Sequence, residues 1–166
     1  MPLDVYIKNS FSSNHYKEVT DDLIAALKFT ATAVNGLNDD DVKISKRLNL
    51  SSRKLRGFEP GKIGPKDGKD FIGGNYAYSV NLEANLPNFF PEKSNAEIGL
   101  FLDAGNVWGV DYSDALDDSN ELRSTIGINT SWLSPAGPLS FIFSQNVTKA
   151  STDVDQSFNF RLGTTF

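Results

Sequence analysis

The stretch Asn75-Tyr-Ala-Tyr-Ser-Val-Asn-Leu-Glu-Ala-Asn-Leu86 decides the fold, because its side chains alternate in character along the chain. Tyr76, Val80 and Leu82 fall on one side, and Asn81 and Glu83 fall on the other. Alternation at period two is typical of a β-strand whose two faces meet different surroundings. The stretch therefore predicts a strand over about residues 74–87, with one apolar face and one polar face.

Six further segments repeat this alternation, so the sequence predicts an all-β, antiparallel protein. They cover about residues 3–11, 23–33, 96–108, 122–132, 139–146 and 156–166. Ile142 breaks the alternation in the sixth strand in order, at 139–146. Residues 13–20, which include His15, are predicted to be a polar connection, and residues 36–72 a long loop rich in charge and glycine.

Composition limits the classes of protein that this chain can belong to. At 166 residues it is long enough for one domain with a core. The net charge of −5, without a long basic run, argues against nucleic-acid binding. The absence of cysteine excludes disulfides and thiolate metal sites. There is no apolar stretch of membrane-helix length and no signal-peptide pattern, so we expect a cytosolic protein or an internal piece of a longer chain.

Strand length and loop pattern favour a transmembrane β-barrel over a soluble β-sandwich. The predicted strands run to about 10–13 residues, as membrane strands do, whereas soluble strands are usually about 5–6 residues long. Long or polar connections at 36–72, 109–121 and 148–155 contrast with shorter ones at 88–95 and 133–137. Outer-membrane barrels have long external loops and short periplasmic turns, and aromatic residues near their strand ends.

The stretch Leu55-Arg56-Gly57-Phe58-Glu59-Pro60-Gly61 lies within the long loop and holds an arginine that we expect to be buried. Strand parity places Glu83 on the face of Asn81, and places Asp103 opposite the apolar residues of its strand. Both carboxylates are therefore predicted to point into the barrel interior, where an arginine could meet them.

Other clusters in the sequence carry no catalytic or metal-binding pattern. His15 is the only histidine and has no triad spacing around it. The acidic runs at 39–41 and 109–121 lack the spacing of a calcium loop, so we expect solvated loops there. The glycines of the long loop do not precede a helix, which excludes a phosphate-binding motif. We predict no catalytic residue, no cofactor and no metal.

Several motifs in order resemble the BamA family (bacterial surface antigen family), the outer-membrane barrel assembly factors of Gram-negative bacteria. They are Leu55-Arg-Gly-Phe58, Gly64-Pro65, Gly73-Gly-Asn75, Phe101-Leu-Asp-Ala-Gly-Asn-Val-Trp108, Ser134-Pro-Ala-Gly-Pro138 and the terminal Phe166. The resemblance implies a barrel of about sixteen strands, of which residues 1–166 supply about the last seven. It also implies that earlier strands and POTRA domains are missing from this chain.

The resemblance implies roles for two groups of residues. In the family, the arginine of the inward loop contacts acidic residues of neighbouring strands, so Arg56, Gly57, Phe58, Glu83 and Asp103 would together form a structural latch. The final strand pairs weakly with the first strand and forms a lateral gate, where substrate strands are templated. The gate residues by resemblance are Phe158, Phe160, Leu162, Gly163 and Phe166, and Gly163 would allow a kink.

The implied function is the folding and insertion of β-barrel proteins into the bacterial outer membrane, without enzymatic chemistry. The implied partners are outer-membrane lipids, unfolded β-barrel client proteins and the accessory lipoproteins of the assembly complex. A related two-partner secretion transporter or a translocation-and-assembly barrel is the alternative. A passive porin and a soluble β-sandwich rank below it.

Overall fold

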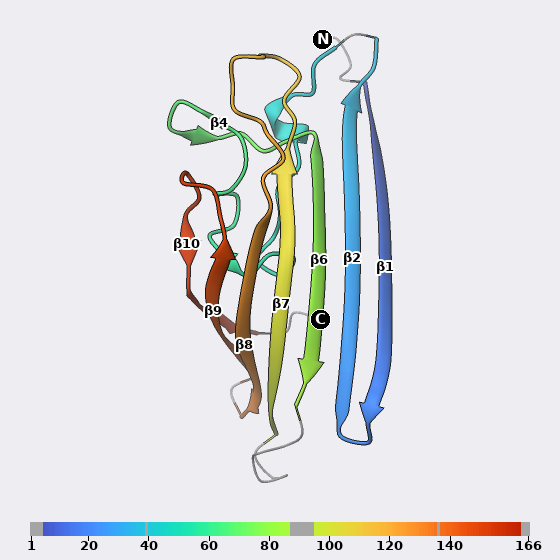
Figure 1. Cartoon of the computed structure of the whole chain (residues 1–166), viewed down its shortest axis with the longest axis vertical. Helices are drawn as coiled ribbons and strands as arrows, with labels where there is room; N and C mark the ends of the chain where they lie inside the picture. The colour runs from blue at the N-terminus through green and yellow to red at the C-terminus, as the bar shows by residue number, and fades with distance from the viewer. Residues whose placement is uncertain (1–4, 39, 87–94, 136, 164–166) are drawn as a thin grey trace.

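The fold is a single curved sheet of seven antiparallel strands, seen in a computed structural model that describes residues 5–38, 40–86, 95–135 and 137–163 (Figure 1). The strands follow one another across the sheet in chain order. They are β1 (Tyr6–Thr20), β2 (Leu23–Gly36), β6 (Tyr76–Asn85), β7 (Ala96–Trp108), β8 (Arg123–Ser134), β9 (Gly137–Thr148) and β11 (Phe158–Leu162). This order confirms the predicted all-β antiparallel architecture, and it rules out two sheets packed as a sandwich.

The remaining elements are short and belong to the connections. A 3-10 turn η1 (Ile44–Lys46) and the strands β3 (Gly57–Phe58), β4 (Lys66–Asp67) and β5 (Asp70–Phe71) lie in the loop between β2 and β6. β4 pairs with β5, and β3 pairs with β10 (Asp155–Gln156), which precedes the last strand. No helix among the described residues is long and apolar enough to cross a membrane.

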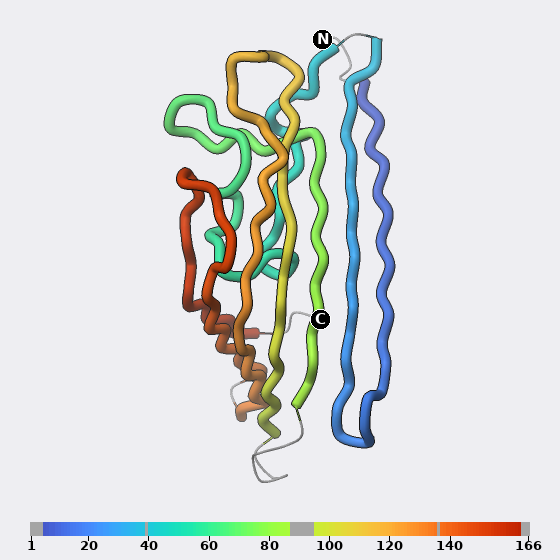
Figure 2. Tube along the Cα trace, viewed as in Figure 1, coloured from blue at the N-terminus to red at the C-terminus, as the bar shows by residue number. Residues whose placement is uncertain are grey.

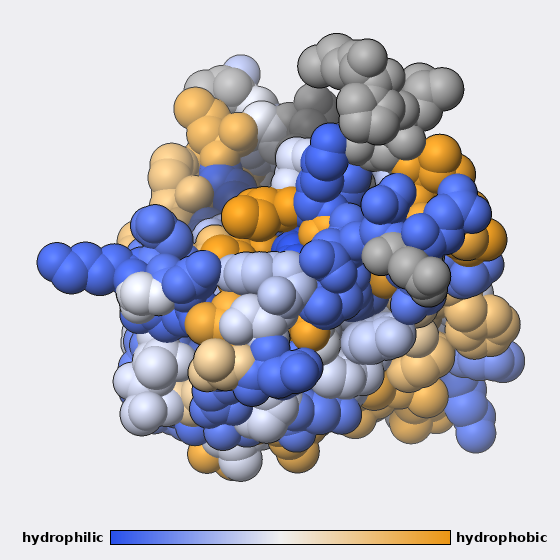
Figure 3. Space-filling model, turned by 90° about the horizontal axis from the view of Figure 1, so that it is seen from above, coloured by the Kyte–Doolittle hydropathy of each residue, from blue (hydrophilic) through white to orange (hydrophobic). Residues whose placement is uncertain are grey.

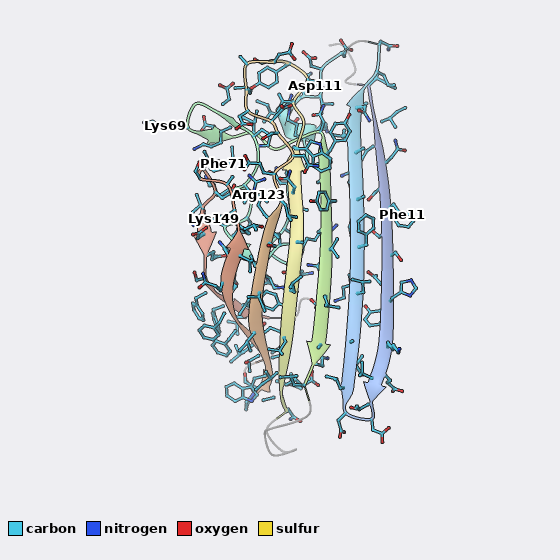
Figure 4. The ribbon with its side chains drawn as sticks, viewed as in Figure 1. Phe11, Lys69, Phe71, Asp111, Arg123 and Lys149 are labelled. Carbon is cyan, nitrogen blue, oxygen red and sulfur yellow. The ribbon has the colours of Figure 1, made fainter. Side chains whose placement is uncertain are left out.

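The outer face of the sheet is apolar and exposed. Register places Leu82 beside Leu102 and Leu102 beside Ile126 on neighbouring strands, so these side chains form a continuous band. The larger exposed members of the band are Leu27, Leu82, Leu100, Leu102, Ile126, Ile128, Phe143, Phe158 and Phe160. Phe11 of β1 likewise points away from the sheet (Figure 4). Apolar side chains outside and polar side chains inside are the arrangement of a barrel in lipid.

Part of the inner face is covered by the connection between β2 and β6, residues 36–72, here called the inward loop; β1 remains exposed. Its trace folds back from one end of the sheet and runs alongside the strands (Figure 2). The sheet contributes Val34, Ala77 and Val107 to a buried cluster. The loop contributes Val42, Leu48, Leu50, Leu55, Phe58 and Ile63. The loop is therefore packed against the sheet by its own hydrophobic core, which is an interior that an open porin lacks.

The two longest connections between the described strands lie at the same end of the sheet. The inward loop, residues 109–122 and residues 149–157 all lie at the end where β2 finishes and β6 begins. Only two residues separate β1 from β2 at the opposite end. Seen from above in Figure 3, the end with the long connections carries mainly hydrophilic residues. This polarity matches the asymmetry of outer-membrane barrels.

The predicted polar connection at 13–20 is wrong, because β1 continues through it to Thr20. His15 pairs with Leu27 in the middle of the hairpin, and is therefore a strand residue and not a turn residue. A strand ladder is built from backbone N–H and C=O groups, so polar side chains do not end it while the partner strand continues. The register shifts only near the hairpin turn, between Glu18 and Thr20.

The last strand begins later than predicted. Gln156, expected at its start, pairs with Gly57 of the inward loop. β11 follows from Phe158 and pairs with β9 over five residues. The predicted gate residue Phe166 and most of the predicted short connection at 88–95 lie outside the described residues.

Candidate functional site: the anchored inward loop

Arg56 is buried against the inner face and makes a two-pronged ion pair with Asp103 of β7. Its Nε donates to Asp103 Oδ2 at 2.6 Å, and its Nη2 donates to Oδ1 at 2.6 Å. The backbone N–H of Arg56 also donates to Oδ2, at 3.0 Å. The side chains of Arg56 and Asp103 are only 8% and 0% exposed. The planar guanidinium matches the carboxylate in this geometry, which fixes the loop in direction as well as in position.

Glu83 of β6 completes the charge cluster around Arg56. Arg56 Nη2 lies 2.8 Å from Glu83 Oε1, and Lys28 Nζ lies 2.6 Å from Glu83 Oε2. The two cations are therefore balanced by Asp103 and Glu83. The structure brings together all three charged residues that parity and resemblance had placed at this site.

Two further residues of the site had not been singled out from the sequence. Asn81 donates to Asp103 Oδ1 at 2.7 Å and to the carbonyl oxygen of Lys54 at 2.8 Å, so it joins the strand, the acid and the loop. The ring of Phe101 lies 3.7 Å from Arg56 Cζ and closes one side of the guanidinium. Asn81 and Asp103 are direct cross-strand partners. Strand parity could therefore have identified Asn81, whereas the stacking of Phe101 depends on the path of the loop.

Gly57 and Phe58 pair with β10 next to the ion pair. Phe58 lies opposite Asp155, and Gly57 lies opposite Gln156. Gly57 has φ +87°, and a Cβ at this position would come within 2.7 Å of Thr125 Cγ2 on β8. A residue with a side chain would be strained there and would push the loop off the sheet. Phe58 is buried in the cluster formed by the loop and the sheet. Ile142, which broke the predicted alternation, lines the same small cavity as Arg56 and Phe58.

A second cross-link joins the inward loop to the connection after β7. Arg47 Nη2 lies 2.8 Å from Asp111 Oδ1, and Asp111 Oδ2 accepts from the backbone N–H of Val42 and from Asn75, both at 2.8 Å. Figure 4 shows Asp111 among the connections at the end of the sheet. The acidic connection 109–121 was predicted to be a solvated loop; Asp111 is exposed there, and in addition three groups of the neighbouring segments bind its carboxylate.

A third cross-link joins β8 to the connection before β11. Arg123 Nε and Nη2 lie 2.8 Å from the two carboxylate oxygens of Asp153, and Arg123 also donates to Asn106 of β7. The side chains of Arg123 and Asp153 are 4% and 0% exposed. Figure 4 labels Arg123, the first residue of β8. Nothing in the spacing of Arg123 and Asp153 pointed to this pair, because the chain between them folds back through β9.

The pKa values of Arg56 in the inward loop and of Asp111 in the connection after β7 each reflect opposing causes. Burial by itself lowers the pKa of Arg56, but the hydrogen bonds and negative charge of Asp103 and Glu83 outweigh it, and the pKa is raised. Burial raises the pKa of Asp111, but hydrogen bonds from Val42 and Asn75 and the charge of Arg47 outweigh it, and the pKa is lowered. Both groups are therefore held in their charged forms.

The predicted gate residues of the final strand lie apart from the ion-pair cluster. Phe158, Phe160 and Leu162 point to the outer face and are exposed. Phe158 and Phe160 stack on Phe143 and Phe141 of β9, with ring centroids 5.0 and 5.2 Å apart. Gly163 follows with φ +107°, a backbone conformation that favours glycine. Their role in a gate stays a prediction.

No cluster of three or more histidine, aspartate or glutamate side chains suited to a metal ion occurs within the described residues. The carboxylates described above are instead engaged by arginine, lysine or backbone N–H groups.

Comparison with known proteins gives relatives with the same architecture. The chain is 34% identical over 140 residues to the outer membrane protein assembly factor BamA of Neisseria meningitidis serogroup B, covering 68% of this chain and 17% of that protein. It is 28% identical over 138 residues to BamA of Neorickettsia risticii, covering 81% of this chain and 18% of that protein. The chain thus spans less than a fifth of the length of these curated relatives.

A solved structure has the same fold. The crystal structure of BamA from Haemophilus ducreyi lacking POTRA domains 1-3 superposes with a TM-score of 0.84 at 27% sequence identity, covering 95% of this chain and 34% of that one. The Omp85 superfamily domain matches residues 4–166, almost the whole chain. The long antiparallel strands, the outward apolar face and these matches agree, and the chain belongs to the Omp85 superfamily.

Proposed function

We propose that this chain is the C-terminal part of a BamA-like assembly factor, which folds β-barrel proteins and inserts them into the bacterial outer membrane. The observation that supports this most strongly is the inward loop held by Arg56 and Asp103, within a sheet that matches BamA over 95% of this chain. A passive pore has no use for an interior filled by a packed loop. In an assembly factor, the loop would brace the wall while one edge of the sheet works on a client strand.

The proposal assigns a role to each part of the chain. The inward loop, residues 36–72, is the brace, and Arg56, Gly57, Phe58, Glu83 and Asp103 form its latch. The final strand, which begins at Phe158, is the gate edge, where a client strand adds by backbone pairing. Earlier barrel strands and POTRA domains complete the protein, and accessory lipoproteins and membrane lipids are its partners. The reaction needs edge-strand templating and local membrane thinning, with no catalytic residue and no cofactor.

Reconstitution of the full-length protein that carries this segment tests the proposal. A urea-unfolded outer-membrane barrel is added to phospholipid vesicles, and its folding is followed by the shift in gel mobility of unheated samples. We expect faster folding in vesicles that contain the protein than in empty vesicles or in vesicles with a porin of similar mass. Equal rates in all three preparations would contradict the proposal.

The same vesicles discriminate the second candidate, a secretion or translocation barrel of the same superfamily. An assembly factor leaves its client in the membrane, where the strands are shielded from added protease. A secretion barrel delivers a filamentous client to the vesicle lumen, where it is released when detergent opens the vesicles. Lumenal delivery without insertion would favour the secretion function.

A further inference from the structure

The final strand is joined to the inward loop at its start, by contacts that do not involve the Arg56 ion pair. Asp155 and Gln156 pair with Phe58 and Gly57 of the loop, and the backbone N–H of Glu59 donates to the carbonyl oxygen of Val154 at 2.9 Å. One residue later, the carbonyl oxygen of Ser157 accepts from the backbone N–H of Ser144 on β9, at 2.8 Å. The chain therefore passes from the loop to the barrel wall at Ser157.

A second contact joins the loop to the final strand further along. Arg161 Nη2 donates to both the carbonyl oxygen and the hydroxyl oxygen of Ser52, each at 2.9 Å. Ser52 lies four residues before Arg56, in the part of the loop that approaches the anchor. Arg56, Ile142 and Arg161 line one small cavity. The inward loop, β9 and β11 thus meet around the same space, through Arg56, Ile142 and Arg161 respectively.

The contact of Arg161 is of a weaker kind than the anchor. Arg56 and Arg123 bind buried carboxylates with two nitrogen atoms each. Arg161 binds two neutral oxygens with one nitrogen, and it takes part in no ion pair with a carboxylate among the residues that the structure describes. A hydrogen bond between two charged groups is stronger than one to a neutral oxygen. The Arg56–Asp103 ion pair is therefore suited to hold the loop on the sheet permanently. The Arg161 contact, being weaker, is suited to break and re-form.

We propose that Arg161 is a positioning residue that ties the gate strand to the inward loop and releases it when the edge moves. The strand stays fixed at its start through the pairing of β3 with β10. Beyond Ser157 it stays paired with β9 over Phe158–Leu162, and once Arg161 leaves Ser52 this paired edge moves away from the loop. This inference rests on the proposed function, because it assumes that client strands pair with the edge formed by β11.

Distance measurements between spin labels in the full-length protein test the tie directly. The labels are attached to the substitutions Arg53→Cys in the loop and Leu162→Cys in β11, which are both exposed positions. Any cysteine elsewhere in the full-length protein is replaced by serine. In phospholipid vesicles we expect a single narrow distance distribution. Arg161→Ala removes both hydrogen bonds and should broaden it toward longer distances. Arg161→Lys keeps one donor group and should give an intermediate width.

Asn159→Ala is the matched control, because Asn159 lies on the same face of β11 and its side-chain amide donates to nearby Gln156 at 2.9 Å. Its distribution should remain narrow. A second label pair at Leu27 and Leu102 of the outer face reports on the wall, and it should not change in any variant. An unchanged Arg53–Leu162 distribution in Arg161→Ala would overturn the proposal. Broadening of both label pairs would also overturn it, since Arg161 would then support the whole fold.

These distances do not depend on client folding, so the two proposals can fail separately. A narrow distribution that broadens in Arg161→Ala, in a protein that folds no client, would retain the tie and reject the assembly function. Normal client folding with no change in Arg161→Ala would retain the assembly function and reject the tie.

Discussion

Arg56 and Asp103 are joined by three hydrogen bonds, two through the guanidinium and one through the backbone N–H of Arg56. The carboxylate belongs to the middle of β7, and the arginine belongs to a loop that starts at the end of β2. A loop of this length loses much conformational entropy when it is ordered. The ion pair and the hydrophobic cluster beside it offset that loss and hold the loop on the wall.

Replacing Arg56 should destabilise the full-length barrel more than replacing any exposed residue of the loop. Arg56→Ala leaves Asp103 buried without its cation, and we expect a loss of about 3–5 kcal/mol in the free energy of unfolding. Denaturant titration of the protein in detergent, followed by tryptophan fluorescence, measures it. Arg53→Ala, three residues earlier and exposed, is the control and should change the free energy of unfolding by less than about 0.5 kcal/mol.

A double-mutant cycle tests whether Arg56 and Asp103 act as a pair. We expect Arg56→Ala and Asp103→Ala together to cost clearly less than the sum of the single losses, because the second change removes a charge that the first left unpaired. Additivity of the two losses within about 0.5 kcal/mol would show that the two residues do not depend on each other.

Gly57→Ala should displace the loop, because two separate costs fall on one position. The backbone has φ +87°, and the added Cβ would meet Thr125 on β8. Gly61 also has a positive φ, +71°, but a Cβ there would meet nothing within 4 Å. Gly61→Ala therefore isolates the backbone cost, about 1–2 kcal/mol. We expect a larger loss of unfolding free energy from Gly57→Ala, and equal losses would remove the close approach as a cause.

The connection before β11 contains a buried and an exposed ion pair that should differ in their contributions. Asp153→Ala leaves Arg123 buried without its carboxylate partner, and we expect a loss of about 3–5 kcal/mol in unfolding free energy. Lys149→Ala breaks a pair with Asp155 whose side chains are 47% and 39% exposed, and should cost about 0–1 kcal/mol. Denaturant titration of both variants provides the comparison. A similar loss in the two variants would contradict the burial argument.

The contribution of Asp111 to stability should depend on pH. Its pKa is lowered in the folded protein, so its stabilisation is present above the ordinary carboxylate pKa and is lost as pH falls through the lowered value. Wild type should therefore melt at a higher temperature than Asp111→Asn at neutral pH, and this difference should shrink below about pH 4. Asp114→Asn in the same connection serves as the control. A difference in melting temperature that is independent of pH would show that the charge of Asp111 is not what stabilises the loop.

Strand parity was enough to predict most of the sheet and part of the site. The alternation in β6 and β7 assigned Asn81, Glu83 and Asp103 to the inner face before any contact was known. It failed in β1, where polar residues such as His15 continue a ladder that backbone groups maintain. It also had no explanation for Ile142. The inner face was expected to be polar, but Ile142 is apolar there because the inward loop covers this position.

The sequence by itself determined which residues face inward, because side chains on a strand alternate with the pleat and need no information from elsewhere in the chain. It also carried the motif around Arg56 that distinguishes this chain from an ordinary strand protein. Only the tertiary structure decided the partners of Arg47, Arg123 and Arg161, since each contact joins elements through the path of a loop. That path follows from the packing of Leu55 and Phe58 against the sheet, and strand periodicity does not encode it.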